Sequence, residues 1–195
     1  MSSTARRLSP QVIQWGHMVK VIAALLAAAA LSSAQGFYSN RRAPGFALPD
    51  SNFKRYDLQD YRGKWFLIDF MRTDCPHCKA LTKVLEKAKV KYGAKIAVLK
   101  IVLSPPDTQA TVAKYIAENK VTSPIVFDMG QVAASYFNAT PQRSSFDTPH
   151  LFIIDPNGKI VQDYGHSDQN HDIIEGEGLF KELDALFAGK PATKK

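Results

Sequence analysis

The chain has 195 residues, of which 45% are hydrophobic and 22% charged, and its formal net charge is +7. This composition excludes a disordered polymer, a collagen-like repeat and a multi-span membrane protein, and the length suits one domain with an appendage. Only two cysteines are present, so the chain is not a small domain held together by several disulfides. Both cysteines stand in one tetrapeptide, Cys75-Pro76-His77-Cys78.

The first 34 residues have the pattern of a secretory signal peptide. Three basic residues precede an apolar run at 21–31, and small residues follow it, with an expected cleavage after Ala34. The run is 11 residues long, shorter than the roughly 18 that a spanning helix needs. The alternatives are an uncleaved N-terminal anchor and a buried helix. The pattern therefore predicts an exported protein, most simply one of the bacterial periplasm.

The charge of the mature chain does not indicate a nucleic-acid partner. Removing residues 1–34 takes away three cations and no anion, which lowers the net charge from +7 to +4. An excess of this size is ordinary for solubility. We expect no nucleic-acid partner, and contact with a membrane only if residues 1–34 are retained.

The remaining chain predicts one α/β domain of three layers. Residues 35–42 are polar and indicate a linker, residues 43–190 form the domain, and residues 191–195 form a basic tail. Strands alternate with helices and end in a hairpin and a closing helix, which favours a mixed central sheet. A small hairpin is expected within 46–65, strands at 65–71, 96–103, 124–127, 150–154 and 159–164, helices at 76–92, 107–120, 131–137 and 178–187, and a loop at 138–148.

The two cysteines are placed where a strand gives way to a helix. Cys75 would lie at the helix N-terminus, where unpaired N–H groups and the helix dipole favour a thiolate. Cys78, one turn further on, can reach it to form a disulfide. We therefore expect Cys75 to attack and Cys78 to resolve the mixed disulfide. Pro76 fits the first helical position, and His77, if protonated near the sulfur, would stabilise the thiolate.

Two other interpretations of the cysteine pair remain. A structural disulfide between residues so close in sequence would close almost no loop and would stabilise little. A zinc or copper site could combine the pair with His150, His166 or His171, but a second pair at metal spacing is lacking. We assign no metal ligand and no cofactor.

Several motifs together resemble the redoxin-type thioredoxin-fold proteins, and more narrowly the TlpA/ResA group of exported thiol–disulfide oxidoreductases. The motifs cover about residues 43–188, and in chain order they are Ala43-Pro44-Gly45-Phe46, Leu58-Gln59-Asp60-Tyr61-Arg62-Gly63-Lys64, Phe70-Met71-Arg72-Thr73-Asp74-Cys75 and Thr148-Pro149 with the hairpin after it. The resemblance implies a thioredoxin-like sandwich with an N-terminal hairpin extension. It also implies protein dithiols and disulfides as substrates, and a membrane or soluble redox partner.

The resemblance also assigns three residues outside the cysteine pair. Pro149 matches the cis-proline that faces the disulfide, and the backbone of Thr148 is expected to hold the partner chain as an added strand. Asp69 stands six residues before Cys75, where thioredoxin has a buried carboxylate. Burial raises the pKa of such an aspartate, which could take the proton of Cys78. The alternative for Asp69 is a carboxylate satisfied by a lysine or water, without a catalytic part.

This sequence departs from the group next to the cysteines. Met71 and Asp74 replace two aromatic residues, and Asp74 would oppose a thiolate at Cys75 while Arg72 would support it. Pro76-His77 resembles the dipeptide of the DsbA oxidants, so the sequence leaves the direction of electron flow open. The loop at 138–148 is long for the group, and we expect it to shape the substrate groove.

Two further functions are weighed against disulfide exchange. Peroxiredoxins have Pro seven and Thr three residues before the peroxidatic cysteine, whereas Ile68 and Arg72 stand there in this chain. A copper metallochaperone of the same fold would use Cys-x-x-x-Cys, whereas the spacing here is two residues. Exchange of disulfides with protein cysteines is the leading prediction.

Overall fold

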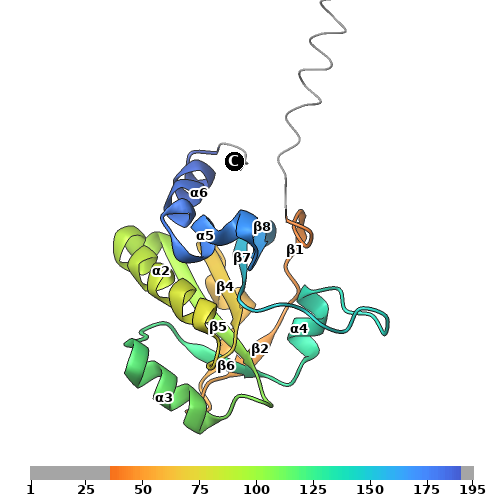
Figure 1. The fold of residues 1–195 in the computed structure, drawn as a ribbon. Helices are drawn as coiled ribbons and strands as arrows, with labels where there is room; N and C mark the ends of the chain where they lie inside the picture. The colour runs from red at the N-terminus through yellow and green to blue at the C-terminus, as the bar shows by residue number, and fades with distance from the viewer. Residues whose placement is uncertain (1–35, 190–195) are drawn as a thin grey trace, which may run out of the picture. The chain divides into compact units, whose positions relative to one another are not determined.

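The computed structural model describes residues 36–189, so the expected signal peptide or anchor and the basic tail lie outside the described residues. A six-stranded sheet with the order β1-β8-β7-β4-β5-β6 forms the centre of the domain (Figure 1). β4, β5 and β6 are parallel, whereas β7 is antiparallel to β4 and β8 is antiparallel to β7. The strands are β1 (Arg41–Arg42), β4 (Trp65–Met71), β5 (Ile96–Leu103), β6 (Ile125–Asp128), β7 (His150–Ile154) and β8 (Lys159–Gly165).

Separate elements cover the two faces of this sheet. On one face lie α2 (Pro76–Tyr92), α3 (Gln109–Asn119), α5 (His171–Glu175) and α6 (Gly178–Phe187), whose apolar residues pack against the sheet in two clusters. On the other face lie the hairpin β2 (Ala47–Pro49) with β3 (Arg55–Asp57), the 3-10 turn η1 (Leu58–Tyr61) and α4 (Gln131–Tyr136). The predicted three-layer α/β fold with a mixed sheet and an N-terminal hairpin is confirmed.

The strand and helix that carry the site form for local reasons. β4 is apolar except for Asp69, and its residues 66–71 are buried, as expected for a strand covered on both faces. α2 begins with Pro76 at its first position, where the missing N–H costs nothing. It ends at Gly93, whose φ of 54° is unfavourable for other residues. β4 and α2 therefore meet at a fixed junction, which holds the cysteines.

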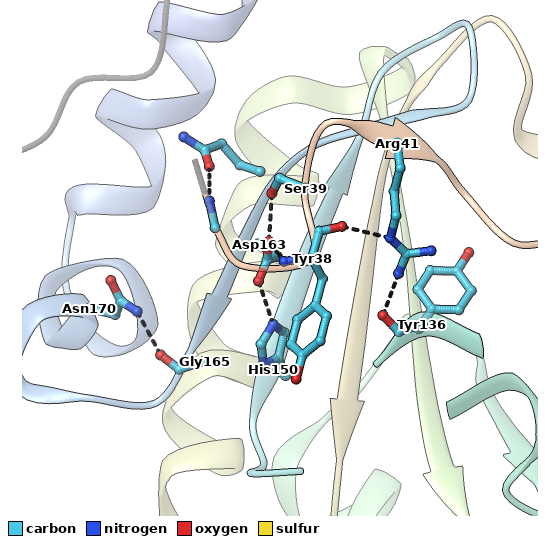
Figure 2. A network of polar contacts seen from close by, with 10 residues as sticks. Tyr38, Ser39, Arg41, Tyr136, His150, Asp163, Gly165 and Asn170 are labelled. Carbon is cyan, nitrogen blue, oxygen red and sulfur yellow. Dashed lines mark hydrogen bonds and ion pairs between the residues drawn. The ribbon is translucent and has the colours of Figure 1, made fainter. Parts of the chain in front are cut away.

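The segment interpreted as a linker is bonded to the sheet. Its strand β1 is antiparallel to β8 (Figure 1). Figure 2 shows that Asp163 of β8 accepts hydrogen bonds from the Tyr38 N–H at 2.9 Å and the Ser39 hydroxyl at 2.6 Å. Arg41 donates to the carbonyl oxygens of Tyr38 and Tyr136. Each of these bonds involves a polar side chain, and β1 has only two residues, so no apolar periodicity in the sequence could have indicated the strand.

Two short elements after β8 were not predicted either. They are the 3-10 turn η3 (Asp168–Asn170) and α5, and between them they bury only Ile174 completely. Caps hold them in place, since Ser167 accepts from the Asn170 N–H, and the Asn170 amide donates to the Gly165 carbonyl at 2.8 Å. None of the helices within residues 36–189 is long and apolar enough to cross a membrane.

Candidate active site

Cys75 and Cys78 lie at the junction of β4 and α2, with different exposure. Cys75 caps α2, and its Sγ accepts a hydrogen bond from the Cys78 N–H at 3.2 Å. Cys75 is partly exposed, whereas Cys78 is buried, and both are free thiols. A partner can therefore reach Cys75, while Cys78 is accessible only from inside the site.

A cis peptide bond faces the exposed cysteine. The bond between Thr148 and Pro149 is cis, as the sequence resemblance implied, and it directly precedes β7. The Cys75 Sγ lies 3.8 Å from the Thr148 carbonyl oxygen. This geometry brings the backbone at Thr148 beside the reactive sulfur, where an extended chain could pair with it.

A buried ion pair lies under the cysteines. Asp69 of β4 is opposite Lys100 of β5 in the strand register, and the Lys100 Nζ is 2.9 Å from the Asp69 Oδ2. Both side chains are fully buried, and the Asp69 Oδ1 has no hydrogen-bond partner among residues 36–189. Burial raises the pKa of Asp69, and the charge of Lys100 opposes that rise. The free oxygen leaves Asp69 able to accept a proton.

Cys78 is a poor acid in this environment. Burial, the negative charge of Asp69 and the hydrogen bond to Cys75 raise the pKa of Cys78 well above its ordinary value. A thiol with such a pKa needs a base close by before it can attack a disulfide. Of the charged groups that raise the pKa of Cys78, Asp69 has the largest effect.

Lys100 was not predicted as a site residue. It is the only charged residue in the apolar run of β5, and a lysine is almost never fully buried unless it is paired. That isolated charge is the signal in the sequence that could have indicated Lys100 as the buried partner of Asp69. The sequence did anticipate a lysine as one partner for Asp69.

The opposed charges next to Cys75 pair with each other. Arg72 donates to both carboxylate oxygens of Asp74, at 3.0 and 2.7 Å. This pairing raises the pKa of Arg72. Thr73 between them hydrogen-bonds to Asp107 through its hydroxyl and its N–H, so the turn before α2 is fixed. The sequence could not rank the two charges, and the geometry shows that each compensates the other.

His77 and Pro76 lie in the first turn of α2, and His77 bonds away from the cysteines. Its Nδ1 is 2.5 Å from the Glu175 Oε1, and this hydrogen bond is the main reason why the pKa of Glu175 is lowered. Within residues 36–189 no hydrogen bond joins His77 to Cys75 or Cys78. The expected contact between the imidazole and the thiolate is therefore replaced by a contact with α5.

A cleft of about 430 Å³ is lined in part by Thr148, whose carbonyl oxygen is 3.8 Å from the Cys75 Sγ. Part of the predicted loop, residues 144–148, forms one wall, and the ends of β4 and β5 form the other. Phe146 is held in the wall by stacking on Phe137, with ring centroids 4.0 Å apart. The lining residues are Phe70, Met71, Arg72, Ile101, Leu103, Pro106, Ser144, Ser145, Phe146, Asp147 and Thr148.

The fold, together with a partly exposed Cys75 and a buried Cys78, defines the class of thioredoxin-fold thiol–disulfide oxidoreductases. Known proteins agree with this class. The model of the AhpC/TSA family matches residues 40–163, and the chain belongs to that family.

Named relatives share the class at low identity. The thiol-disulfide oxidoreductase ResA of Bacillus cereus is 26% identical over 136 residues, which are 66% of this chain and 75% of the relative. The thioredoxin-like protein YneN of Bacillus subtilis is 26% identical over 129 residues, 66% of this chain and 71% of the relative. A solved thiol-disulfide oxidoreductase from Bacteroides fragilis has a TM-score of 0.58 at 21% identity, covering 75% of this chain and 99% of that structure.

Proposed function

We propose that the protein exchanges disulfides with cysteines of other proteins, with Cys75 as the attacking and Cys78 as the resolving sulfur. The observation that carries the proposal is the position of Cys75. It is partly exposed, caps α2 and lies 3.8 Å from the carbonyl of Thr148 beside cis-Pro149. Cys78 is buried behind it and close to Asp69.

In the direction of substrate reduction, the exchange takes two steps. The Cys75 thiolate attacks one sulfur of a protein disulfide, the substrate S–S bond breaks, and the other substrate sulfur leaves as a thiolate that takes a proton from solvent. Asp69 then accepts the proton of Cys78, and the Cys78 sulfur attacks Cys75. The mixed disulfide breaks, the substrate leaves with two reduced cysteines, and the enzyme holds a Cys75–Cys78 disulfide. A partner dithiol must reduce that disulfide before the next cycle.

Substrate binding is assigned to the surface around Cys75. The backbone of Thr148 would pair with the extended substrate chain, and Pro149 would keep that backbone facing the sulfur. Pro76 and His77, which are exposed at the start of α2, would contribute to the same surface. The cleft beside residues 144–148 would take an apolar substrate side chain.

The experiment that tests the exchange is reduction of insulin disulfides by dithiothreitol. We expect the protein to accelerate the reduction, Cys75→Ser to abolish it, and Cys78→Ser to accumulate a mixed disulfide that survives denaturation. Lys87→Ala, an exposed change on α2, is the matched control and should keep full activity. Activity that survives Cys75→Ser would contradict the proposal, and rapid thiol-driven consumption of peroxide would indicate a peroxidase instead.

We infer that the physiological direction is reduction of substrates. The contact of His77 with Glu175 directs the imidazole away from Cys75. The Pro76-His77 dipeptide, which resembles that of the DsbA oxidants, therefore does not place an imidazole beside the Cys75 sulfur. The Arg72–Asp74 pair adds no net charge near the sulfur. We expect the reduction potential of the couple to lie nearer the value of about −270 mV for thioredoxin than the value of about −120 mV for DsbA. Equilibration with glutathione measures this potential. A value near that of DsbA would show that the protein oxidises its substrates instead of reducing them.

We propose that the protein is exported to the periplasm by residues 1–34. The support is the order of a basic segment, an apolar run at 21–31 and a small-residue cleavage position. Fractionation of cells that express the full chain should place it in the periplasm, with a mature mass that begins at Gln35. Leu26→Arg would block export by breaking the apolar run. A full-length mass in the membrane fraction would show an anchor instead.

A further inference from the structure

Three histidines lie around one carboxylate beside the cysteine pair. The Glu175 Oε1 is 2.5 Å from the His77 Nδ1 and 3.9 Å from the His166 Nε2. The rings of His77 and His166 are 3.8 Å apart between centroids and tilted by 31°. His171 is near enough for its charge to lower the pKa of Glu175 as well. Disulfide exchange as proposed above uses neither His166 nor Glu175.

The group has the donors of a metal site. One ligand atom each from His77, His166 and Glu175 lies within 4.8 Å of the others. Two imidazoles and one carboxylate are the protein ligands of several zinc sites, in which a fourth position is open to water or substrate. Imidazole nitrogens also suit copper and nickel, whereas calcium and magnesium prefer sites built from oxygen.

We propose that His77, His166 and Glu175 bind one divalent transition-metal ion of the kind that prefers imidazole, with Zn²⁺ as the ion to test. Zinc bonds of about 2.0–2.2 Å place tetrahedral ligand atoms roughly 3.4 Å apart. The His77 Nδ1 and the Glu175 Oε1, now 2.5 Å apart, must therefore separate by about 0.9 Å, and the His166 Nε2 and the Glu175 Oε1, now 3.9 Å apart, must close by about 0.5 Å. Side-chain rotation can supply this movement, because the side chains of His77 and His166 are 48% and 32% exposed.

The backbone under the three ligands is already fixed. The His166 N–H donates to the Pro149 carbonyl at 3.2 Å, and the Gly176 N–H closes α5 on the Asp172 carbonyl at 3.1 Å. His77 is the second residue of α2, whose first turn is capped by Cys75. The cost of ordering the ligands therefore falls on side chains, which lowers the entropy that binding must offset.

Occupation of the site would connect three elements around Cys75. The ligands come from the start of α2, the residue after β8 and the end of α5. A bound ion would add a link between them, so it should stabilise the folded chain against unfolding. The proposal does not depend on the proposed function, because neither cysteine is a ligand.

The test must exclude the cysteines, since a reduced Cys-x-x-Cys pair can itself bind zinc. We would use the untagged full chain with Cys75→Ser and Cys78→Ser, titrate it with ZnCl₂, and measure binding by competition with a chromophoric chelator. We expect one ion per chain. In that background His166→Ala and Glu175→Gln should each weaken binding at least about 10-fold. His171→Ala, a histidine beside the group that supplies no ligand atom, is the matched control and should change binding less than about twofold.

Two further measurements on the double serine variant itself do not depend on whether the ligand variants fold. ZnCl₂ at about 100 times the dissociation constant should raise the unfolding midpoint of the double serine variant by roughly 5–10 °C. The imidazole NMR signals of His77 and His166 should shift with the same stoichiometry, while those of buried His150 stay in place. Absence of binding, binding that survives both His166→Ala and Glu175→Gln, or loss in His171→Ala would overturn the assignment.

Discussion

We expect the ion pair of Asp69 and Lys100 to contribute to the proposed exchange more than to the stability of the fold. Both side chains are fully buried, and the desolvation of two charges offsets much of their attraction. A well-packed apolar pair would be as stable in that place. The ion pair instead leaves a carboxylate with a raised pKa and one free oxygen beside a thiol that is hard to ionise. This is the arrangement that a proton acceptor for Cys78 needs.

Asp69→Asn should slow the second step of exchange and leave the first step unchanged. An amide cannot take the proton of Cys78, and removal of a general base costs about 100-fold or more. In the unmodified protein the release rate should fall as the pH is lowered through the raised pKa of Asp69, because protonation removes the base. In Asp69→Asn that dependence should vanish. Stopped-flow decay of a preformed mixed disulfide measures the step.

Two further variants show whether Asp69 acts as a base or only as a structural carboxylate. Lys100→Met removes the charge that opposes the rise in the pKa of Asp69, so the pH profile of release should move to higher pH. Glu118→Gln changes an exposed carboxylate on α3 and should leave the profile in place. If release in Asp69→Asn equals release in the unmodified protein at every pH, Asp69 has no catalytic part.

At the scale of elements, the loop before β7 forms one wall of the apolar cleft. Residues 144–148 run along the ends of β4 and β5 and lead directly into the cis peptide bond at Pro149. Phe146 anchors the loop on Phe137 and lies near Phe70, with centroids 6.3 Å apart. The cleft is therefore continuous with the backbone that would hold the substrate.

Ser145→Trp should weaken substrate binding more than the chemical step. Ser145 is exposed and lines the cleft, so an indole at this position would occupy the space proposed for a substrate side chain. We expect KM for a protein disulfide to rise several-fold with kcat nearly unchanged. Gln142→Trp puts the same ring on the loop outside the cleft and serves as the control. Equal kinetics in both variants would show that the cleft does not bind substrate.

At the scale of the whole molecule, local patterns in the sequence predict the helices and strands, but they do not predict polar contacts between distant residues. The strand at 65–71, the place of Cys75 at the start of a helix and the hairpin after Pro149 follow from local patterns, and the structure confirms them. The contact of His77 with Glu175 joins positions 98 residues apart, and the bond of Tyr38 to Asp163 joins positions 125 apart. Both are made by polar groups, which leave no periodicity in a single sequence.

Asp163 joins the N-terminal segment to the strand that follows the cis-proline (Figure 2). One of its oxygens accepts from Tyr38 and Ser39, and the other is 3.0 Å from the Nε2 of His150. The carboxylate is almost fully buried; its contact with His150 is shielded from water, and those with Tyr38 and Ser39 are partly buried. Loss of one accepting oxygen would remove at least one hydrogen bond from this network.

Asp163→Asn should therefore lower the free energy of unfolding of the whole domain. The amide replaces one accepting oxygen with a donor that faces another donor, at a cost of about 2 kcal/mol. Ser39→Ala removes a single donor to the same carboxylate and should cost about 1 kcal/mol or less. Urea unfolding measures both, and an unchanged m-value would show that the unfolding remains that of one cooperative unit. If Asp163→Asn costs no more than Ser39→Ala, the N-terminal segment adds little to the stability of the sheet. A larger loss in Asp163→Asn with the m-value unchanged would mean that residues 36–42 belong to the cooperative domain, because β1 then unfolds together with the strands it borders.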